Sequence, residues 1–164
     1  MKFNREKYID LLMYILTKTY SHEAFGKTLL CSMMYFIDFN YYELFGELLT
    51  NETYIKSKKG IKPKHFKEIT TELIDKKQLF LKKESYYNRT ILRYYPTIIP
   101  TVKFNSQEKK IINNSITKLY NNNANTIISY ARKDPPIIIA NLGEKIDCRY
   151  VFSRNNKYKI NNFI

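Results

Sequence analysis

Apolar residues recur at three- and four-residue intervals near the start of the chain, the spacing of one buried face of an α-helix. The stretch from Tyr8 to Leu16 has this pattern, and Asn4 precedes it as a residue type that caps helices. These signals predict a first helix that starts after Asn4 and ends near Thr19.

A second helix is predicted from about Lys27 to Phe45, because Gly46 suits the left-handed conformation that ends many helices. Its apolar residues cover nearly the whole circumference instead of one stripe: Leu30, Met33, Met34, Phe36, Ile37, Phe39, Tyr41, Tyr42 and Leu44. Helices of this kind are buried on several sides. We therefore expect it to be the central helix of the fold.

Shorter elements are predicted in the middle of the chain. An extended piece at residues 54–58 and a turn at Gly60 precede a third helix, which we expect to begin at Pro63 because proline is favoured in the first helical turn. Residues 76–95 lack a helical period and are rich in Tyr, Thr, Leu and Ile. This composition predicts a β-hairpin.

The last third of the chain carries four predicted elements: a helix from Ser106, a helix over 125–131, an apolar turn opened by Pro135 and Pro136, and a strand from Lys145 to Phe152. The whole pattern predicts a helix-dominated α+β fold. We expect a single compact domain over residues 1–152, with a β-hairpin and a short C-terminal strand, and a polar tail at 153–164 that frays.

Composition excludes several classes of protein. A hydrophobic fraction of 44% in 164 residues is too high for a disordered chain. Charged residues such as Arg5 and Asp10 argue against a signal peptide, and Asp38 interrupts the most apolar stretch, so no membrane span is expected. Cys31 and Cys148 lie far apart, which fits a reducing compartment. We expect a cytoplasmic protein.

Residues that carry chemistry do not form a catalytic or metal-binding pattern. His22, His65 and the two cysteines lack the close spacing of zinc ligands. Gly26-Lys27-Thr28 resembles the end of a phosphate-binding loop, but Ser21 stands where the first glycine is needed. His65 and Glu68 share one face of the third predicted helix, and we interpret them as an exposed ion pair. We expect no enzyme, no catalytic residue, no metal and no cofactor.

Positive charge is concentrated in the middle of the chain. The net charge is +13, and residues 54–133 alone contain 18 basic and 5 acidic residues. Such a region attracts anionic partners. Lysines outnumber arginines by 22 to 6, as A+T-rich codons also produce. The alternatives are therefore a solvated surface, an acidic protein partner, and nucleic acid.

Two groups of residues in this region are candidates for binding a partner. One is a set of lysines near the third predicted helix, and the other mixes cations with tyrosines in the predicted hairpin: Lys62, Lys64, Lys67, Lys82, Lys83, Tyr86, Tyr87, Arg89, Arg93 and Tyr94. Tyr and Arg anchor many protein interfaces, and the same mixture suits single-stranded nucleic acid. The hairpin could instead pack one face on the core. Three helices followed by a basic hairpin are also the order of a winged helix–turn–helix.

Asp38 lies within an apolar helix, where an unpaired carboxylate would be costly. We expect it to accept hydrogen bonds from a Tyr hydroxyl or from backbone amides of a neighbouring loop, such as the loop around Gly60. The alternative is that it anchors a cation of a partner.

Several stretches resemble one known family. They are Leu29-Leu30 followed by Tyr-Phe-Ile-Asp-Phe-Asn-Tyr-Tyr at 35–42, then Gly46-Glu47-Leu48-Leu49-Thr50, Tyr54-x-Lys56, and Lys59-Gly60-Ile61-Lys62-Pro63. On these residues, the chain from about Lys7 to Asp75 resembles the Panacea domain, also called the SocA-like antitoxin domain.

A weaker similarity to the C-terminal part of that domain covers residues 127–129, 135–136 and 143–147. There Ala131-Arg132 stands where the family often has a Ser/Thr-His pair, and Pro136-Ile137 stands where Pro-Trp is often found.

The resemblance implies a small cytoplasmic helical domain, carried by bacteria and their phages or prophages, that neutralises a toxin by direct binding. It also implies that Asp38, Gly60 and Pro63 are framework residues. We therefore predict a non-enzymatic antitoxin whose basic face, residues 56–93, docks on an acidic or nucleic-acid-mimicking surface of its target. The alternatives are a phage or prophage inhibitor of a host defence system, and a nucleic-acid-binding regulator.

Overall fold

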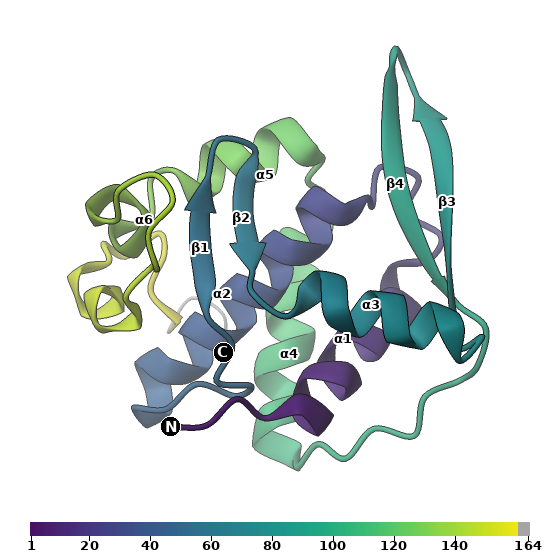
Figure 1. The fold of residues 1–164 in the computed structure, drawn as a ribbon. Helices are drawn as coiled ribbons and strands as arrows, with labels where there is room; N and C mark the ends of the chain where they lie inside the picture. The colour runs from purple at the N-terminus through teal and green to yellow at the C-terminus, as the bar shows by residue number, and fades with distance from the viewer. Residues whose placement is uncertain (161–164) are drawn as a thin grey trace.

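The computed structural model describes residues 1–160, which are arranged around one long helix (Figure 1). The helices are α1 (Arg5–Thr19), α2 (Lys27–Phe45), α3 (Phe66–Asp75), α4 (Ser106–Leu119), α5 (Ala124–Ala131), α6 (Pro135–Ile139) and the 3-10 helix η1 (Cys148–Ser153). The strands are β1 (Tyr54–Ser57), β2 (Gly60–Pro63), β3 (Leu79–Tyr86) and β4 (Arg89–Pro96). The predicted helix-dominated α+β class is confirmed.

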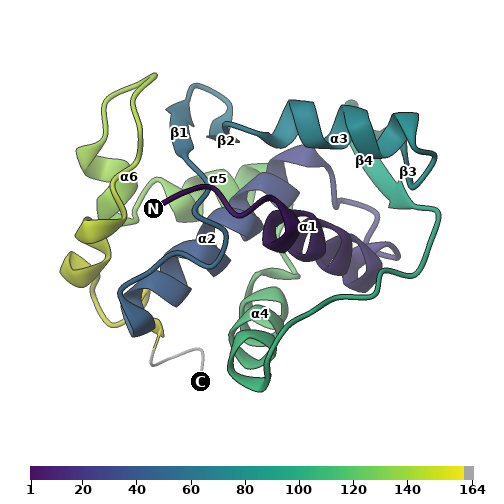
Figure 2. The same ribbon diagram turned by 60° about the horizontal axis from the view of Figure 1, so that its bottom comes forward.

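The long helix α2 is the centre of the core. All of its residues from Leu29 to Asn40 are buried. Figure 2 shows α1, α4 and α5 placed around it, and β2, β4 and η1 also contact it. Burial of each large apolar side chain contributes about 1.5–3 kcal/mol, so α2 supplies much of the stability. Within residues 1–160, no helix is both long enough and apolar enough to cross a bilayer.

Local capping explains why the helix boundaries follow from the sequence. The Asn4 side chain accepts a hydrogen bond from the Lys7 amide at the start of α1. Gly46 ends α2 with a φ of +73°, in the left-handed region that glycine adopts without strain. At the start of α4, Asn105 and Glu108 cap each other's backbone amides. The predicted α1, α2 and α4 are confirmed.

The predicted hairpin in residues 76–95 is also confirmed. Strands β3 and β4 are antiparallel, from Leu79 opposite Pro96 to Tyr86 opposite Arg89. In Figure 1 the tip of this hairpin extends beyond the rest of the molecule. Tyr87 takes a positive φ of +51° in the two-residue turn, as tight hairpin turns require.

Pro63 is the last residue of β2 and not the first residue of a helix, so that prediction is wrong. It lies opposite Tyr54 in the antiparallel β1–β2 hairpin, and α3 begins at Phe66. The Tyr54 carbonyl accepts a hydrogen bond from the Ile146 amide, on the side away from β2. The Tyr54–Pro63 pair therefore exchanges no hydrogen bonds, and the amide that proline lacks is not needed there.

The predicted strand from Lys145 to Phe152 is also wrong. Only Lys145 pairs in β fashion, through a single antiparallel bridge to Ile55. The chain then turns into η1, because the Asp147 carboxylate accepts a hydrogen bond from the Arg149 amide and starts a helical turn.

The predicted tail packs onto the body as far as it is described. Arg154, Tyr158 and Ile160 are buried, so the expected fraying does not occur within residues 153–160. Residues 161–164 of the predicted tail lie outside the described residues.

A buried group of charges, which we call the ionic cluster, holds this segment. The Arg154 guanidinium donates to both carboxylate oxygens of Asp134, at 2.8 and 2.7 Å. The Tyr35 hydroxyl also donates to Asp134, at 2.8 Å. The third Arg154 nitrogen, Nη1, donates to the side-chain oxygens of Asn40 and Glu43 on α2, at 2.9 and 3.0 Å. The cluster therefore ties the C-terminal segment to α2 and to the start of α6.

Candidate functional site

A cavity of about 570 Å³ opens where the first turn of α2 meets the two hairpins. The start of α3 and the start of α5 complete its walls. We call this cavity the basic groove, and its lining residues are Ala24, Gly26, Lys27, Thr28, Leu29, Cys31, Ser57, Lys59, Ile61, Lys62, Pro63, Lys64, Phe66, Lys67, Arg89, Thr90, Ile91, Leu92 and Ala124.

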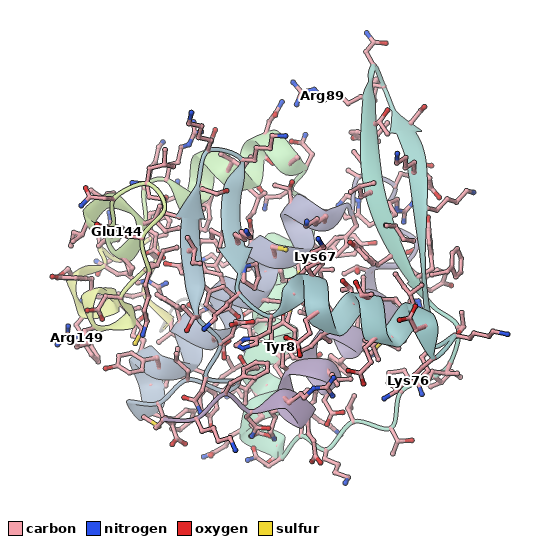
Figure 3. All side chains as sticks on the ribbon, in the orientation of Figure 1. Tyr8, Lys67, Lys76, Arg89, Glu144 and Arg149 are labelled. Atoms are coloured by element: carbon pink, nitrogen blue, oxygen red, sulfur yellow. The ribbon has the colours of Figure 1, made fainter. Side chains whose placement is uncertain are left out.

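Positive charge dominates the basic groove. Its charged lining residues are all cations: Lys27, Lys59, Lys62, Lys64, Lys67 and Arg89. None of these six forms an ion pair with a carboxylate of residues 1–160. Figure 3 shows Lys67 on α3 and Arg89 near the tip of the β3–β4 hairpin. The groove is therefore a concentration of uncompensated charge.

Two contacts fix cations at the edges of the groove. Lys27 lies over the ring of Phe66, with 5.3 Å from its ammonium nitrogen to the ring centre. Arg89 donates a hydrogen bond of 2.6 Å to the side-chain oxygen of Asn125 on α5. These contacts orient the two side chains without neutralising their charge.

Gly26 lets β4 approach the start of α2 closely. A Cβ atom at this position would lie 3.3 Å from both the Ile91 Cβ and the Leu92 carbonyl oxygen. Contacts this close force one neighbour to move. Gly26 also provides no side-chain cap, so the first turn of α2 keeps its positive dipole end beside the groove.

Gly60 fixes the opposite wall. It has a φ of +115°, and a Cβ there would meet Ile128 of α5 at 3.5 Å and Thr28 of α2 at 3.8 Å. The hairpin turn therefore rests on both helices. The framework role that the family resemblance implies for Gly60 stays a prediction.

Asp38 has the type of partners expected from the sequence. Its carboxylate accepts hydrogen bonds from the Tyr54 hydroxyl at 2.6 Å and from the Thr50 amide at 2.8 Å. The Thr50 hydroxyl donates as well. The loop that supplies the amide is at Thr50 and not at Gly60. Burial raises the pKa of Asp38 to about 6, although these hydrogen bonds oppose the rise. Asp38 thus joins α2 to the start of β1.

Only part of the predicted partner-binding set lies together. Lys62, Lys64, Lys67 and Arg89 all line the basic groove. The other six predicted residues do not: Lys82, Lys83, Tyr86, Tyr87, Arg93 and Tyr94.

Arg93 and Tyr94 are used inside the protein. The Arg93 guanidinium donates to Glu84 at 2.9 Å and to the Tyr20 carbonyl at 2.7 Å. Tyr94 is buried with its ring edge-on to Phe66. Their cationic and aromatic groups therefore hold the hairpin to the body.

The remaining hairpin residues form a less basic surface, on which Tyr86 is partly buried and the other three are exposed. Lys82 lies 3.6 Å from Glu84, and Lys83 is exposed on the same strand. Tyr86 and Tyr87 line a separate shallow depression that also contains Glu23 and Glu84. The two groups predicted from the sequence thus belong to different surfaces.

Two groove cations are not among the binding residues named from the sequence, although Lys59 lies within the predicted basic face. Lys27 opens α2 and Lys59 lies in the β1–β2 turn. The signal for Lys27 was Gly26-Lys27-Thr28, a small residue and a cation at a helix start. This motif is not a phosphate-binding loop, but its lysine is part of the charged surface of the groove.

His65 contacts a different carboxylate from the one expected. Its ring nitrogen lies 2.9 Å from Glu52, and its ring stacks on Phe3. Glu68 does not pair with it.

The described residues offer little reactive or metal-binding chemistry. Burial raises the pKa of the Cys31 thiol to about 12, which makes this thiol a poor nucleophile. Within residues 1–160, no group of three or more His, Cys, Asp or Glu residues is arranged to hold a metal ion.

The fold and the groove define a helix-dominated domain with one cation-lined cavity against its central helix. A profile of the family described as "Antitoxin SocA-like, Panacea domain" matches residues 30–136, well over half of the chain. The chain therefore belongs to this family, as its sequence resemblance predicted. Searches of curated proteins and of solved structures found no match. The matched stretch contains every groove cation except Lys27.

Proposed function

We propose that this protein is an antitoxin that neutralises a protein target by direct, non-catalytic contact, and that the basic groove makes the contact. The observation that carries the proposal is the group of six cations around one cavity, without ion pairs to the described carboxylates. Membership of an antitoxin family supports it. We place this action in the cytoplasm.

The charge of the groove indicates an acidic target surface. Complementary charge accelerates the encounter of two proteins and excludes partners of the wrong sign. Because lysine ammonium groups are point charges on flexible stems, the groove suits several carboxylates better than one rigid planar group. An acidic or nucleic-acid-mimicking region of a toxin meets these requirements.

Nucleic acid fits the surface less well. A bound strand needs a continuous track of cations along its backbone. Outside the groove that track is interrupted by Glu68 and Glu72 on α3 and by Glu84 on β3. We therefore rank a protein target above a nucleic-acid target.

The proposal is tested by capture and rescue. The tagged full chain is used to capture partners from a nuclease-treated lysate of cells that make it, and a stoichiometric partner is identified by mass spectrometry. That partner is then expressed alone and together with this protein. The proposal predicts that it stops growth alone and that coexpression restores growth.

Two outcomes would overturn the proposal. One is a stoichiometric partner that has no effect on growth and whose activity this protein does not change. The other is recovery of DNA or RNA before nuclease treatment and of no protein after it, which would favour a nucleic-acid-binding regulator. A partner that belongs to a host defence system would retain the binding mechanism and identify the protein as a phage or prophage inhibitor.

A further inference from the structure

We propose that the basic groove binds a short acidic segment of the target in extended conformation, and that this segment adds a strand to the open edge of β2. The inference rests on the proposed function and specifies which part of the target is recognised. Three features of the groove carry it: an unpaired strand edge, a ring of cations, and an apolar wall.

The unpaired edge follows from the hydrogen bonds of β1. The Lys56 amide donates to the Glu144 carbonyl at 3.0 Å, and the Lys56 carbonyl accepts from the Gly143 amide at 2.8 Å. Both groups therefore point away from β2, so Lys56 and its partner Ile61 form a pair that exchanges no hydrogen bonds. The amide and carbonyl of Ile61 must point to the other edge of β2.

That other edge lies at the groove. Ile61 lines the groove, and Figure 1 shows β2 between β1 and the β3–β4 hairpin. Within residues 1–160, no third strand pairs with β2. An open edge offers one donor and one acceptor in the positions that an incoming strand needs.

The cations stand along the same edge. Lys59 precedes β2, Lys62 is on β2, and Lys64 follows it, and all three side chains are exposed. Lys67 and Lys27 face the groove from α3 and α2. A strand paired with β2 would therefore have cations beside it on several sides, which selects Asp and Glu side chains.

The apolar wall favours a segment that is not uniformly acidic. The partly buried Ile91 and Leu92 of β4 line the groove. Side chains of an extended segment alternate between two sides. A segment with acidic residues on one side and β-branched residues on the other satisfies both the lysines and this wall.

A polypeptide matches these features better than a nucleotide does. Only a polypeptide has backbone N–H and C=O groups spaced to pair with a strand edge. Base recognition needs an accessible aromatic face, but Phe66, the one aromatic residue that lines the groove within residues 1–160, is 3% exposed with Lys27 over its ring.

The test uses the full chain labelled with nitrogen-15 and a synthetic peptide, acetyl-Glu-Ile-Asp-Val-Glu-Ile-Asp-Val-amide. In a titration followed by NMR, we expect the amide signals of Ile61 and of the first turn of α2 to shift. The triple variant Lys62→Glu/Lys64→Glu/Lys67→Glu should weaken binding by about tenfold or more at low salt.

A matched variant controls for net charge. Lys109, Lys110 and Lys133 are exposed, lie outside the groove and form no ion pair with a described carboxylate. The variant Lys109→Glu/Lys110→Glu/Lys133→Glu changes the net charge by the same amount. It should bind the peptide within about twofold of wild type, because these side chains do not line the groove and act on the peptide only across solvent.

Further probes separate the features. A peptide with Gln and Asn in place of Glu and Asp should bind at least about tenfold more weakly. Two peptides methylated on alternate backbone amides test the edge, and at least one of them should lose binding.

Four results would overturn the inference. They are no shift at millimolar peptide, equal binding of the neutral peptide, full binding of both methylated peptides, and tighter binding of an eight-nucleotide oligo-dT that has the same sensitivity to the groove variant. If the peptide fails but target capture still depends on the groove lysines, the proposed function stands and only the acidic-strand occupant is wrong. If the peptide binds as expected but the captured partner is neither toxic nor neutralised, the proposed function fails and the groove specificity stands.

Discussion

The charged side chains at the two ends of α2 differ in burial and in pairing. Near its C-terminal half, the ionic cluster and Asp38 hold buried charges that are hydrogen-bonded to defined partners. At its N-terminal end, the basic groove exposes cations that lack carboxylate partners among the described residues. A desolvated ion must be paired, whereas a hydrated ion remains available to a partner at little cost to stability. The charges of the first region are therefore committed to contacts within the fold, and those of the second are available for binding.

The largest expected effect comes from breaking the ionic cluster. Arg154→Ala would leave the Asp134 carboxylate buried without its cation, and both side chains are fully buried. Removal of one partner from a buried pair typically destabilises by about 3–5 kcal/mol. Urea unfolding should show this loss.

An exposed pair provides the control for that variant. Arg149 pairs with Asp147 at the surface, so Arg149→Ala should leave the stability close to wild type. Equal losses in the two variants would contradict the distinction between paired buried charge and exposed charge.

The second effect is a pH dependence that comes from Asp38. Its pKa of about 6 in the folded protein lies above its ordinary value of 3.8. As the pH rises from about 4 to 6, the unfolded chain therefore releases the proton first, and the folded state loses stability on the order of 3 kcal/mol relative to pH below 4. Asp38→Asn should remove this loss, because an amide can still bond Thr50 and Tyr54 but does not titrate.

The measurement is urea unfolding of wild type and Asp38→Asn at several pH values between 4 and 7. The stability difference, wild type minus variant, should fall as the pH rises. A difference that is constant with pH would show that Asp38 titrates normally in the folded protein.

A third effect should come from the groove wall itself. Gly26→Val places methyl groups against Ile91 and the Leu92 carbonyl, where a Cβ alone would already lie 3.3 Å from each. Overpacking of this kind typically destabilises by about 1–3 kcal/mol. Thermal unfolding should show the loss. The comparison variant is Gly143→Ala, because Gly143 has a positive φ but no neighbour within 4 Å of its Cβ position, so this variant tests backbone strain without overpacking. Unchanged stability of Gly26→Val would mean that β4 is not held closely to α2.

The smallest effect is expected at the hairpin tip. Tyr87 is 87% exposed and does not line the basic groove. Tyr87→Ala should leave the rate of dissociation from the target unchanged, because the target occupies the groove. A large increase in that rate, measured by surface plasmon resonance, would move the binding site to the hairpin tip.

Elements with local signals could be predicted from the sequence. Asn4 acts through its own side chain and Gly46 through its own backbone, so the start of α1 and the end of α2 follow from neighbouring residues. Pro63 carries an ambiguous signal, since proline fits both a first helical turn and a strand position that needs no amide. Its role depended on the hydrogen bond between Tyr54 and Ile146, which are distant in sequence.

The candidate site was predictable only in part for the same reason. Lys62, Lys64 and Lys67 are close in sequence, so they were found as a group. Lys27 joins them because α2 packs against β2 and its ammonium group lies over the ring of Phe66, contacts between segments that are distant in sequence. The burial of Arg93 depends on Glu84 across the hairpin and on the distant Tyr20 carbonyl, so composition alone could not separate it from exposed cations.

The central claim is that the groove lysines bind the target, and binding kinetics test it most directly. The captured target is measured against wild type, the Lys62→Glu/Lys64→Glu/Lys67→Glu variant, and the Lys109→Glu/Lys110→Glu/Lys133→Glu control at low and high salt. We predict that the groove variant binds about tenfold or more weakly at low salt, largely through slower association, and that the control matches wild type. Equal affinity of wild type and the groove variant at low salt would contradict the claim.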